Sequence, residues 1–261
     1  MTGPAWPAAP AVVLDFDGVV CDGSTECALV TWYGHFNRPV EEFSTIGLSH
    51  VPATFLQRFR DLRGYARHLD HFLVPLLGGV EELPSQREFD VMFAAIPESI
   101  REGFRTRVDA YRAAVRRTYR EEWLAHHSIY PGIGDGLRAL EGDWYIVTAK
   151  DTASVLEVLA QRQIRLDPSR IYGEQTDKRA ALREIGDLES SRTVVFVDDS
   201  HANVVAARAD GVAAYWANWG FHNPEQAAAA QRSQTPTLTL EMLGRRLTEH
   251  AELRHQAMGA A

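Results

Sequence analysis

The sequence predicts an α/β protein in which a Rossmann-like, doubly wound parallel sheet is interrupted by an all-helical insertion. A short apolar segment, residues 11–15, lies near the N-terminus and has the composition of a buried strand. From residue 130 onward, segments with helical periodicity alternate with short apolar segments, which is typical of a parallel sheet with helices on both faces. We therefore expect residues 1–21 and 129–261 to form the α/β core domain, and residues 22–128 to form an inserted helical cap domain.

Short apolar segments mark the strands of the core domain. The expected strands are residues 11–15, 144–147, 170–172, 193–197, 212–216 and 237–240. The expected helices are residues 133–140, 152–162, 178–185, 202–210 and the segment from 241 onward. Residues 220–236 are polar and rich in alanine, so we expect a loop or a short helix there. Because the strands are parallel, their carboxyl ends should lie at one edge of the sheet.

Helical periodicity dominates the insertion. The expected helices are residues 24–36, a short helix from 39, residues 52–69 and one long helix from 97 to 127. Residues 73–84 contain Gly78-Gly79 and two prolines, which favour a bend. Since the insertion directly follows the first strand, we expect it to lie over the carboxyl edge of the sheet and to act as a lid.

The composition excludes several classes of protein. The chain has 261 residues, 45% of them hydrophobic, and a net charge of -8, which does not favour a nucleic-acid partner. No segment resembles a membrane span or a signal peptide. The two cysteines, Cys21 and Cys27, fit neither a disulfide framework nor a zinc site. We expect a reduced, cytoplasmic protein without a membrane partner.

Two carboxylates follow the first strand, in the sequence Asp15-Phe16-Asp17-Gly18. In an extended chain, residues i and i+2 point the same way, so Asp15 and Asp17 are expected to enter one crevice. Close carboxylates repel each other, and their burial is costly unless a cation or a proton compensates, of which a magnesium ion is the simplest choice. The pattern therefore predicts a magnesium ion and phosphoryl transfer to an aspartate nucleophile.

Four further residues, at three places in the sequence, lie near the ends or starts of core elements. Thr148 ends a strand and offers a hydroxyl group for a phosphate oxygen. Lys178 begins a helix and can neutralise Asp15 or a phosphoryl group. Asp198 and Asp199 follow another strand and offer oxygen ligands to a hard cation. The chain has only two lysines, Lys150 and Lys178, so a lysine near these acids is less readily explained as a general surface cation.

The segments DFDGVV, VTAK, DK and VDDSHAN occur in this order, and with them the chain resembles the phosphatase branch of the haloacid dehalogenase-like superfamily. The resemblance extends from residue 12 to about residue 243. It implies that Asp15 is the nucleophile and that Asp17 is the general acid and then the general base. It also implies that Thr148 binds phosphoryl oxygens and that Lys178 stabilises the charged groups.

The same resemblance implies Mg²⁺ as the cofactor, held by Asp15, the backbone carbonyl of Asp17 and Asp199. The chain departs from the common fourth motif, because Asp198 replaces a glycine and Asn203 replaces a later acid. Which of Asp198 and Asp199 contacts the metal directly stays open. We favour Asp199, with Asp198 close by and Asn203 holding a metal-bound water.

These features predict a magnesium-dependent phosphatase that hydrolyses a small phosphorylated metabolite through an aspartyl phosphate, as a monomer or homodimer. A phosphomutase acting on a sugar phosphate is one alternative, and a non-catalytic binding protein on this fold is another. The role of Lys150 also stays open between a surface residue and a phosphate contact.

Overall fold

A computed structural model describes residues 6–7, 9–78 and 83–259 of the chain. The chain divides into two compact units, Met1–Asp22 with Ile129–Ala261, and Gly23–Ser128. It passes between them at β2 (Cys21–Asp22) and β3 (Ser128–Ile129), which pair in a small two-stranded sheet. No described helix combines the length and the apolar character needed to cross a membrane.

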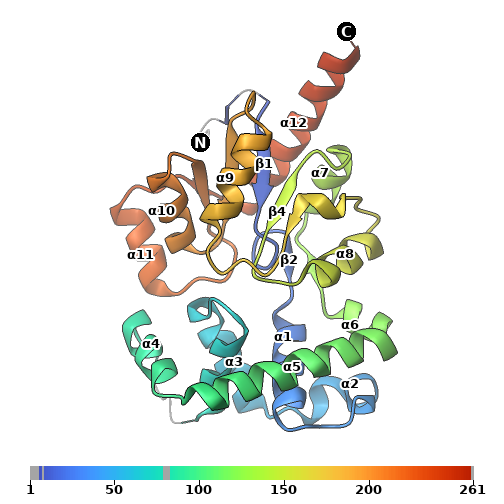
Figure 1. Ribbon diagram of the computed structural model, residues 1–261, viewed down its shortest axis with the longest axis vertical. Helices are drawn as coiled ribbons and strands as arrows, with labels where there is room; N and C mark the ends of the chain where they lie inside the picture. Colours follow the sequence, from blue (N-terminus) through green and yellow to red (C-terminus); the bar gives the residue numbers. More distant parts are fainter. Residues whose placement is uncertain (1–5, 8, 79–82, 260–261) are drawn as a thin grey trace. The chain divides into compact units, whose positions relative to one another are not determined.

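The first unit contains a parallel sheet of six strands in the order β5-β4-β1-β6-β7-β8. Figure 1 shows two of them, β1 and β4, side by side. The strands are β1 (Ala11–Leu14), β4 (Tyr145–Val147), β5 (Ile171–Tyr172), β6 (Val194–Asp198), β7 (Ala213–Ala217) and β8 (Thr237–Leu238). This arrangement confirms the predicted α/β fold with a doubly wound parallel sheet.

The strand order reverses at β1. The chain proceeds from β1 to β4 and β5 on one side, and then returns to place β6 on the other side of β1. Leu14 of β1 is level with Ile146 of β4 and with Val197 of β6. The carboxyl ends of β1 and β6 therefore lie next to each other at the switch point, where open parallel sheets leave a crevice for ligands.

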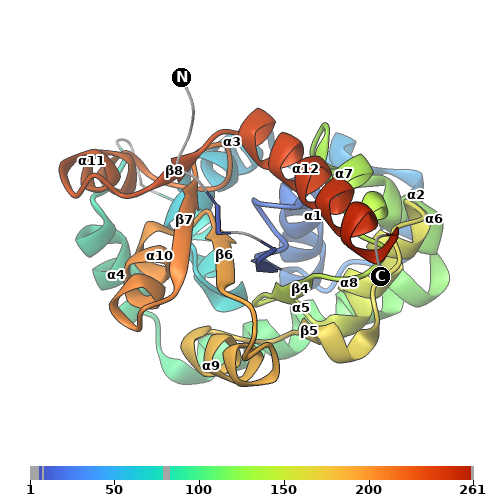
Figure 2. The same ribbon diagram turned by 90° about the horizontal axis from the view of Figure 1, so that it is seen from above.

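Helices cover both faces of this sheet, with α12 on one side and α9 and α10 on the other (Figure 2). The helices of the unit are α7 (Ile133–Ala139), α8 (Thr152–Gln161), α9 (Arg179–Leu188), α10 (His201–Ala209), α11 (Pro224–Arg232) and α12 (Leu240–Gly259), with a short 3₁₀ turn at Pro168–Arg170. All residues of β6 are buried. Its four apolar residues before Asp198 are therefore typical of a strand covered on both faces.

Close packing joins α7 to α12. A Cβ atom added at Gly136 would lie 2.6 Å from Cβ of Leu247, so the approach of the two helices requires glycine there. Leu243 and Leu247 are fully buried on the facing side of α12. The C-terminal helix is thus part of the core packing of this unit.

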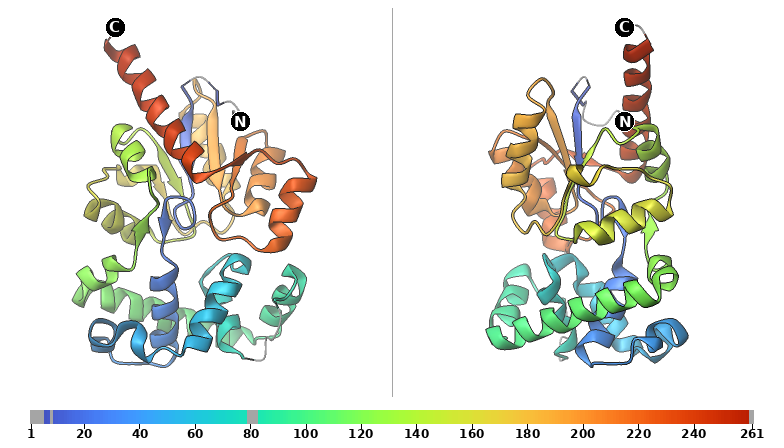
Figure 3. Two further views of the ribbon diagram at one scale, coloured as in Figure 1. Left: turned by 180° about the vertical axis from the view of Figure 1, so that it is seen from behind. Right: turned by 45° about the vertical axis from the view of Figure 1, so that its right-hand side comes forward.

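The second unit is helical (Figure 3). Its elements are α1 (Ser24–His35), α2 (Glu41–Thr45), α3 (Ala53–Leu62), α4 (Gln86–Ala94), α5 (Glu98–Thr118), α6 (Arg120–Ala125) and 3₁₀ segments at Gly47–His50, Arg63–Tyr65 and Leu69–Leu76. The buried face of α5 contains Phe104, Val108, Tyr111 and Val115, at the helical spacing seen in the sequence.

A buried acid ties three helices of this unit together. Glu26 of α1 has no exposed surface and accepts hydrogen bonds from Arg112 Nε at 2.7 Å and Trp123 Nε1 at 3.0 Å. Arg112 belongs to α5 and Trp123 to α6. A buried carboxylate needs such partners, so Glu26 specifies how these helices pack.

Some helix boundaries of the second unit were predicted wrongly. The long helix expected over 97–127 is broken at Tyr119, where φ is −128° and ψ is 52°, and the helix expected over 52–69 ends at Leu62. Part of the expected bend is a 3₁₀ helix up to Leu76, while residues 79–82 lie outside the described residues. Helix α4 was not predicted, although Ser85 and Glu88 form a capping box at its start.

Candidate active site

Asp15 lies directly after β1, at the switch point of the sheet, and its side chain is largely buried. Its Oδ1 atom accepts a hydrogen bond from the backbone N–H of Phe16 at 2.7 Å. Its Oδ2 atom lies 2.7 Å from Nζ of Lys178, which precedes α9. The carboxylate is thus fixed by one backbone donor and one buried ammonium group.

Asp198 is the last residue of β6 and is fully buried. Its Oδ2 atom accepts hydrogen bonds from Lys178 Nζ at 2.8 Å and Asn203 Nδ2 at 3.0 Å, and its Oδ1 atom accepts one from the Ser200 N–H at 2.7 Å. Lys178 therefore bridges Asp15 and Asp198. Three protein donors thus orient Asp198, and its contact with Lys178 holds the lysine in place, while a carboxylate with about four acceptor sites can still offer one to a cation.

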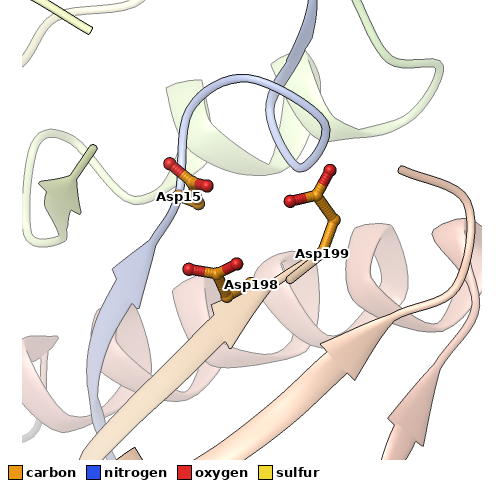
Figure 4. Close-up of side chains that lie close together, drawn as sticks. All are labelled: Asp15, Asp198 and Asp199. Atoms are coloured by element: carbon orange, nitrogen blue, oxygen red, sulfur yellow. The ribbon is translucent and has the colours of Figure 1, made fainter. Parts of the chain in front are cut away.

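Asp199 follows β6 and completes a group of three acids. Ligand oxygens of Asp15, Asp198 and Asp199 all lie within 4.8 Å of one another, and this is the only group of metal-binding type found in the described residues. Figure 4 shows the three carboxylates turned toward a common space. The sequence pattern thus identified acids that the sheet brings together from two separate strands.

Burial and charge shift two pKa values in this group. Burial raises the pKa of Asp15 to about 6, against the opposing effect of Lys178 and with a further contribution from Asp198. Burial alone would lower the pKa of Lys178, but the neighbouring Asp15 and Asp198 raise it above its usual value. Lys178 is therefore a permanent cation, whereas Asp15 gains from any further cation that stabilises its ionised form.

The donor set fits Mg²⁺. Three carboxylates provide the oxygen ligands that hard divalent cations prefer, and they converge from elements that the sheet holds rigidly. With Asp17 included, four acids face the two ammonium groups of Lys150 and Lys178, which leaves two formal negative charges. A divalent cation would balance this excess.

Asp17 does not belong to the three-acid group. The chain bends after Asp15 and turns at Gly18, where φ is +87°, so the geometry of an extended strand does not continue to Asp17. Its Oδ2 atom lies 3.4 Å from Nζ of Lys150. Within the described part of the chain, its Oδ1 atom is buried without a hydrogen-bond partner. This atom is therefore available to a ligand.

Thr148 and Lys150 lie beyond β4, the neighbour of β1. Thr148 is buried, its N–H donates to the carbonyl of Tyr172 at 3.0 Å, and its Oγ1 atom accepts the Lys150 N–H at 3.3 Å. The side chain of Lys150 is only 3% exposed. Lys150 is therefore not a surface residue, which was one of the two interpretations left open. It is buried and paired with Asp17. The scarcity of lysine pointed to a role in the site for both lysines, but sequence analysis assigned such a role only to Lys178.

Strand β7 and the loop that follows it also contact the site, and sequence analysis did not identify them. The N–H of Phe221 donates to Asp199 Oδ2 at 2.6 Å, and the indole N–H of Trp216 donates to the Asp199 carbonyl at 2.7 Å. These contacts join residues about twenty positions apart and involve backbone groups. No residue type in the sequence marks such contacts.

The fold and the site define a class of protein: a doubly wound α/β enzyme with an acidic, lysine-bridged site at its switch point. The sequence matches haloacid dehalogenase-like hydrolases over residues 9–211. The chain therefore belongs to the haloacid dehalogenase-like hydrolase family. The resemblance inferred from the four motifs is confirmed.

Individual relatives agree with this assignment. A phosphoglycolate phosphatase of Chromobacterium violaceum is 33% identical over 121 residues, which represent 42% of this chain and 54% of the relative. The match thus spans about half the length of this curated relative.

Solved structures with low sequence identity share the fold. A putative phosphoglycolate phosphatase from Lactobacillus delbrueckii subsp. bulgaricus is 17% identical, with a TM-score of 0.56 over 92% of this chain and 99% of that chain. A haloacid dehalogenase-like hydrolase from Streptococcus pneumoniae is 17% identical, with a TM-score of 0.55 over 90% and 97% of the two chains.

Proposed function

We propose that this protein is a magnesium-dependent phosphatase that hydrolyses a small phosphorylated metabolite through an aspartyl phosphate on Asp15. The observation that supports this most directly is the buried bridge of Lys178 between Asp15 and Asp198, next to a convergent group of three acids. A carboxylate held at a switch point beside a permanent cation is suited to attack an anionic phosphorus centre.

In the first step, an oxygen of Asp15 attacks phosphorus while the bond between phosphorus and the ester oxygen breaks. Lys178 offsets the repulsion between the carboxylate and the phosphoryl group. Asp17 gives a proton to the departing alkoxide. Its Oδ1 atom suits this role, because it is buried and has no hydrogen-bond partner in the described part of the chain. Thr148 binds a phosphoryl oxygen from the neighbouring strand end.

In the second step, water attacks the phosphorus of the aspartyl phosphate. Asp17 accepts the proton of this water, and the bond between phosphorus and Asp15 breaks, which releases inorganic phosphate and restores both carboxyl groups. Asp15, the carbonyl of Asp17 and Asp199 would hold Mg²⁺, with Asp198 nearby. When bound, the ion supplies charge neutralisation at the phosphoryl oxygens.

The proposed substrate is a phosphorylated small acid or alcohol, and 2-phosphoglycolate is the first compound to test. This choice follows the name of the Chromobacterium violaceum relative, which matches part of the chain. We assign the role of cap domain to the helical unit on sequence grounds, because it is inserted between the first and second motifs.

A phosphate-release assay with 2-phosphoglycolate, glycerol phosphate and sugar phosphates in the presence of Mg²⁺ tests this proposal. We expect turnover by the wild-type protein and a loss of about 10³-fold or more in Asp15→Asn, because an amide cannot act as the nucleophile. Asp135→Asn is the matched control, since Asp135 is a surface residue paired with Arg138.

Comparable activity in a folded Asp15→Asn protein would refute the assigned nucleophile. Isomerised sugar phosphate without phosphate release would instead identify a phosphomutase. Absence of turnover on every ester would favour a binding protein.

A further inference from the structure

The loop between β7 and α11 packs directly against Asp199. It provides the Phe221 N–H that donates to Asp199 Oδ2 at 2.6 Å. Trp216, within β7, donates its indole N–H to the backbone carbonyl of the same aspartate at 2.7 Å. Asp199 is thus held at its side chain and at its main chain by neighbouring parts of one segment.

Two glycines allow this close approach. A Cβ atom at Gly220 would overlap the carbonyl oxygen of Gly18 and Cβ of Asp199. A Cβ atom at Gly18 would overlap Oδ2 of Asp199. The carboxylate of Asp199 therefore lies against two bare backbone segments, one from the motif that follows β1 and one from the loop that follows β7.

The loop itself is well fixed. Asn223 is buried and accepts the Gln226 N–H at 2.9 Å, which caps the start of α11. The rings of His222 and Trp216 lie edge to face, with their centroids 4.9 Å apart. The Nδ1 atom of His222 lies 3.2 Å from the Gly220 carbonyl oxygen. A fixed loop can hold a side chain in one orientation, whereas a loose one cannot.

Asp198 and Asp199 differ in how they are held. Asp198 accepts hydrogen bonds at both oxygens, including one from the Lys178 ammonium group. Asp199 accepts hydrogen bonds from the Phe221 N–H at Oδ2 and from the Trp216 indole N–H at its carbonyl oxygen, and its carboxylate faces the space shared with Asp15 (Figure 4). Hydrogen-bond donors placed in this way hold a carboxylate in one orientation before a cation binds.

We propose that Gly220, the Phe221 amide and the Trp216 indole form a positioning wall that fixes Asp199 for Mg²⁺ and so sets the affinity of the site for the ion. This inference rests on the proposed function. A ligand whose orientation is fixed before binding loses little conformational entropy when the ion arrives. Groups that orient a metal ligand typically change metal affinity by about 10- to 100-fold when they are removed.

Calorimetric titration of Mg²⁺ into the wild-type protein and Gly220→Ala tests the proposal. We expect the Kd for Mg²⁺ to rise about tenfold or more in the variant, because the new methyl group would overlap Asp199 and the Gly18 carbonyl oxygen and so must displace Asp199 or the loop that carries the Phe221 amide. Phosphatase activity should then require correspondingly more Mg²⁺. Gly186→Ala is the control with unchanged affinity, since its Cβ would make only an ordinary contact at 3.9 Å with Val194.

A folded Gly220→Ala protein whose Kd lies within twofold of the wild-type value would overturn the inference. If Gly220→Ala does not fold, Trp216→Phe decides, because it removes the hydrogen bond to the Asp199 carbonyl. A several-fold rise in Kd supports the wall, and an unchanged Kd rejects it. A wild-type protein that neither binds Mg²⁺ nor hydrolyses esters would reject the proposed function itself.

Discussion

Both ends of the parallel sheet carry clusters of charge, buried at the carboxyl end and half-buried at the amino end, and the clusters have opposite composition. At the carboxyl end, four aspartates face two lysines. At the amino end, Asp143 contacts three arginines and Glu189 contacts two of them. The arginine contacts to Asp143 are Arg192 at 2.9 Å, Arg254 at 3.1 Å and Arg170 at 3.4 Å.

The difference distinguishes a cluster that can bind an ion from one that stabilises the fold. We call the second cluster the structural brace; it consists of Asp143, Glu189, Arg170, Arg192 and Arg254. The acidic cluster uses lysine, a compact point charge, and keeps an excess of negative charge that a divalent ion can balance. The basic cluster uses the planar fork of arginine to join α12 to residues that precede β4, β5 and β6. Its cations already outnumber its acids, so it offers nothing to a metal ion.

Removal of Lys178, the cation that bridges Asp15 and Asp198, should have the largest effect of the changes considered, and the effect should be on catalysis. In Lys178→Met, we expect kcat to fall about 10²- to 10³-fold, because the phosphoryl charge loses its fixed partner. Phosphate-release kinetics at saturating Mg²⁺ measure the change. Arg179→Met is the neighbouring control, since Arg179 is an exposed residue paired with Asp177. A folded Lys178→Met protein with normal kcat would show that the bridge is only structural.

Removal of the central acid of the brace should affect stability instead. In Asp143→Asn, we expect the free energy of unfolding to fall by about 2–4 kcal/mol, because three arginines lose their shared carboxylate. Urea denaturation measures this loss, and activity at 25 °C should persist. A variant as stable as the wild type would mean that solvent already compensates these arginines.

The same brace predicts a dependence on pH. Its arginines, Arg192 first, hold the pKa of Asp143 below its usual value despite burial. The contribution to stability is therefore complete above the unfolded pKa of about 4 and is lost as the pH falls through the lower, folded pKa. The stability difference between wild type and Asp143→Asn should shrink in acid, and a difference independent of pH would contradict this account.

The acidic cluster should show the opposite sign. Burial raises the pKa of Asp15 to about 6, so without Mg²⁺ stability should fall as the pH rises from about 4 through 6. Mg²⁺ requires the ionised carboxylate, so its affinity should rise roughly tenfold between pH 5 and 7. Calorimetry at several pH values measures this. Asp15→Asn should lack the fall in stability of the metal-free protein, and the same fall in that variant would assign it to another group.

An exposed ion pair should have the smallest effect. Arg183 lies 3.1 Å from Asp210, and its side chain is 62% exposed. In Arg183→Met, we expect a change below about 0.5 kcal/mol in the free energy of unfolding, because solvent screens the pair. Thermal denaturation beside Asp143→Asn measures it. A loss as large as that of Asp143→Asn would show that burial does not distinguish the two kinds of pair.

Local patterns in the sequence were sufficient for the sheet and for most of the acidic site. The apolar segments predicted where the strands lie in the sequence, and the acids Asp15, Asp198 and Asp199 lie directly at strand ends. The same reasoning failed at Tyr119, where apolar periodicity continues through a break in the helix. The same reasoning also missed α4, because the glycines and prolines before it favoured a bend and the capping box of Ser85 and Glu88 was overlooked.

What the sequence alone determined is the set of strands in the parallel sheet and the order of the acids and lysines along the chain, because periodicity and residue type are local properties. Only the tertiary structure decided which acid each lysine contacts. Lys150 pairs with Asp17 across 133 positions, and Lys178 joins Asp15 to Asp198. It also decided that Gly220 and Phe221 support Asp199, because backbone contacts between distant segments depend on how the strands are arranged in the sheet.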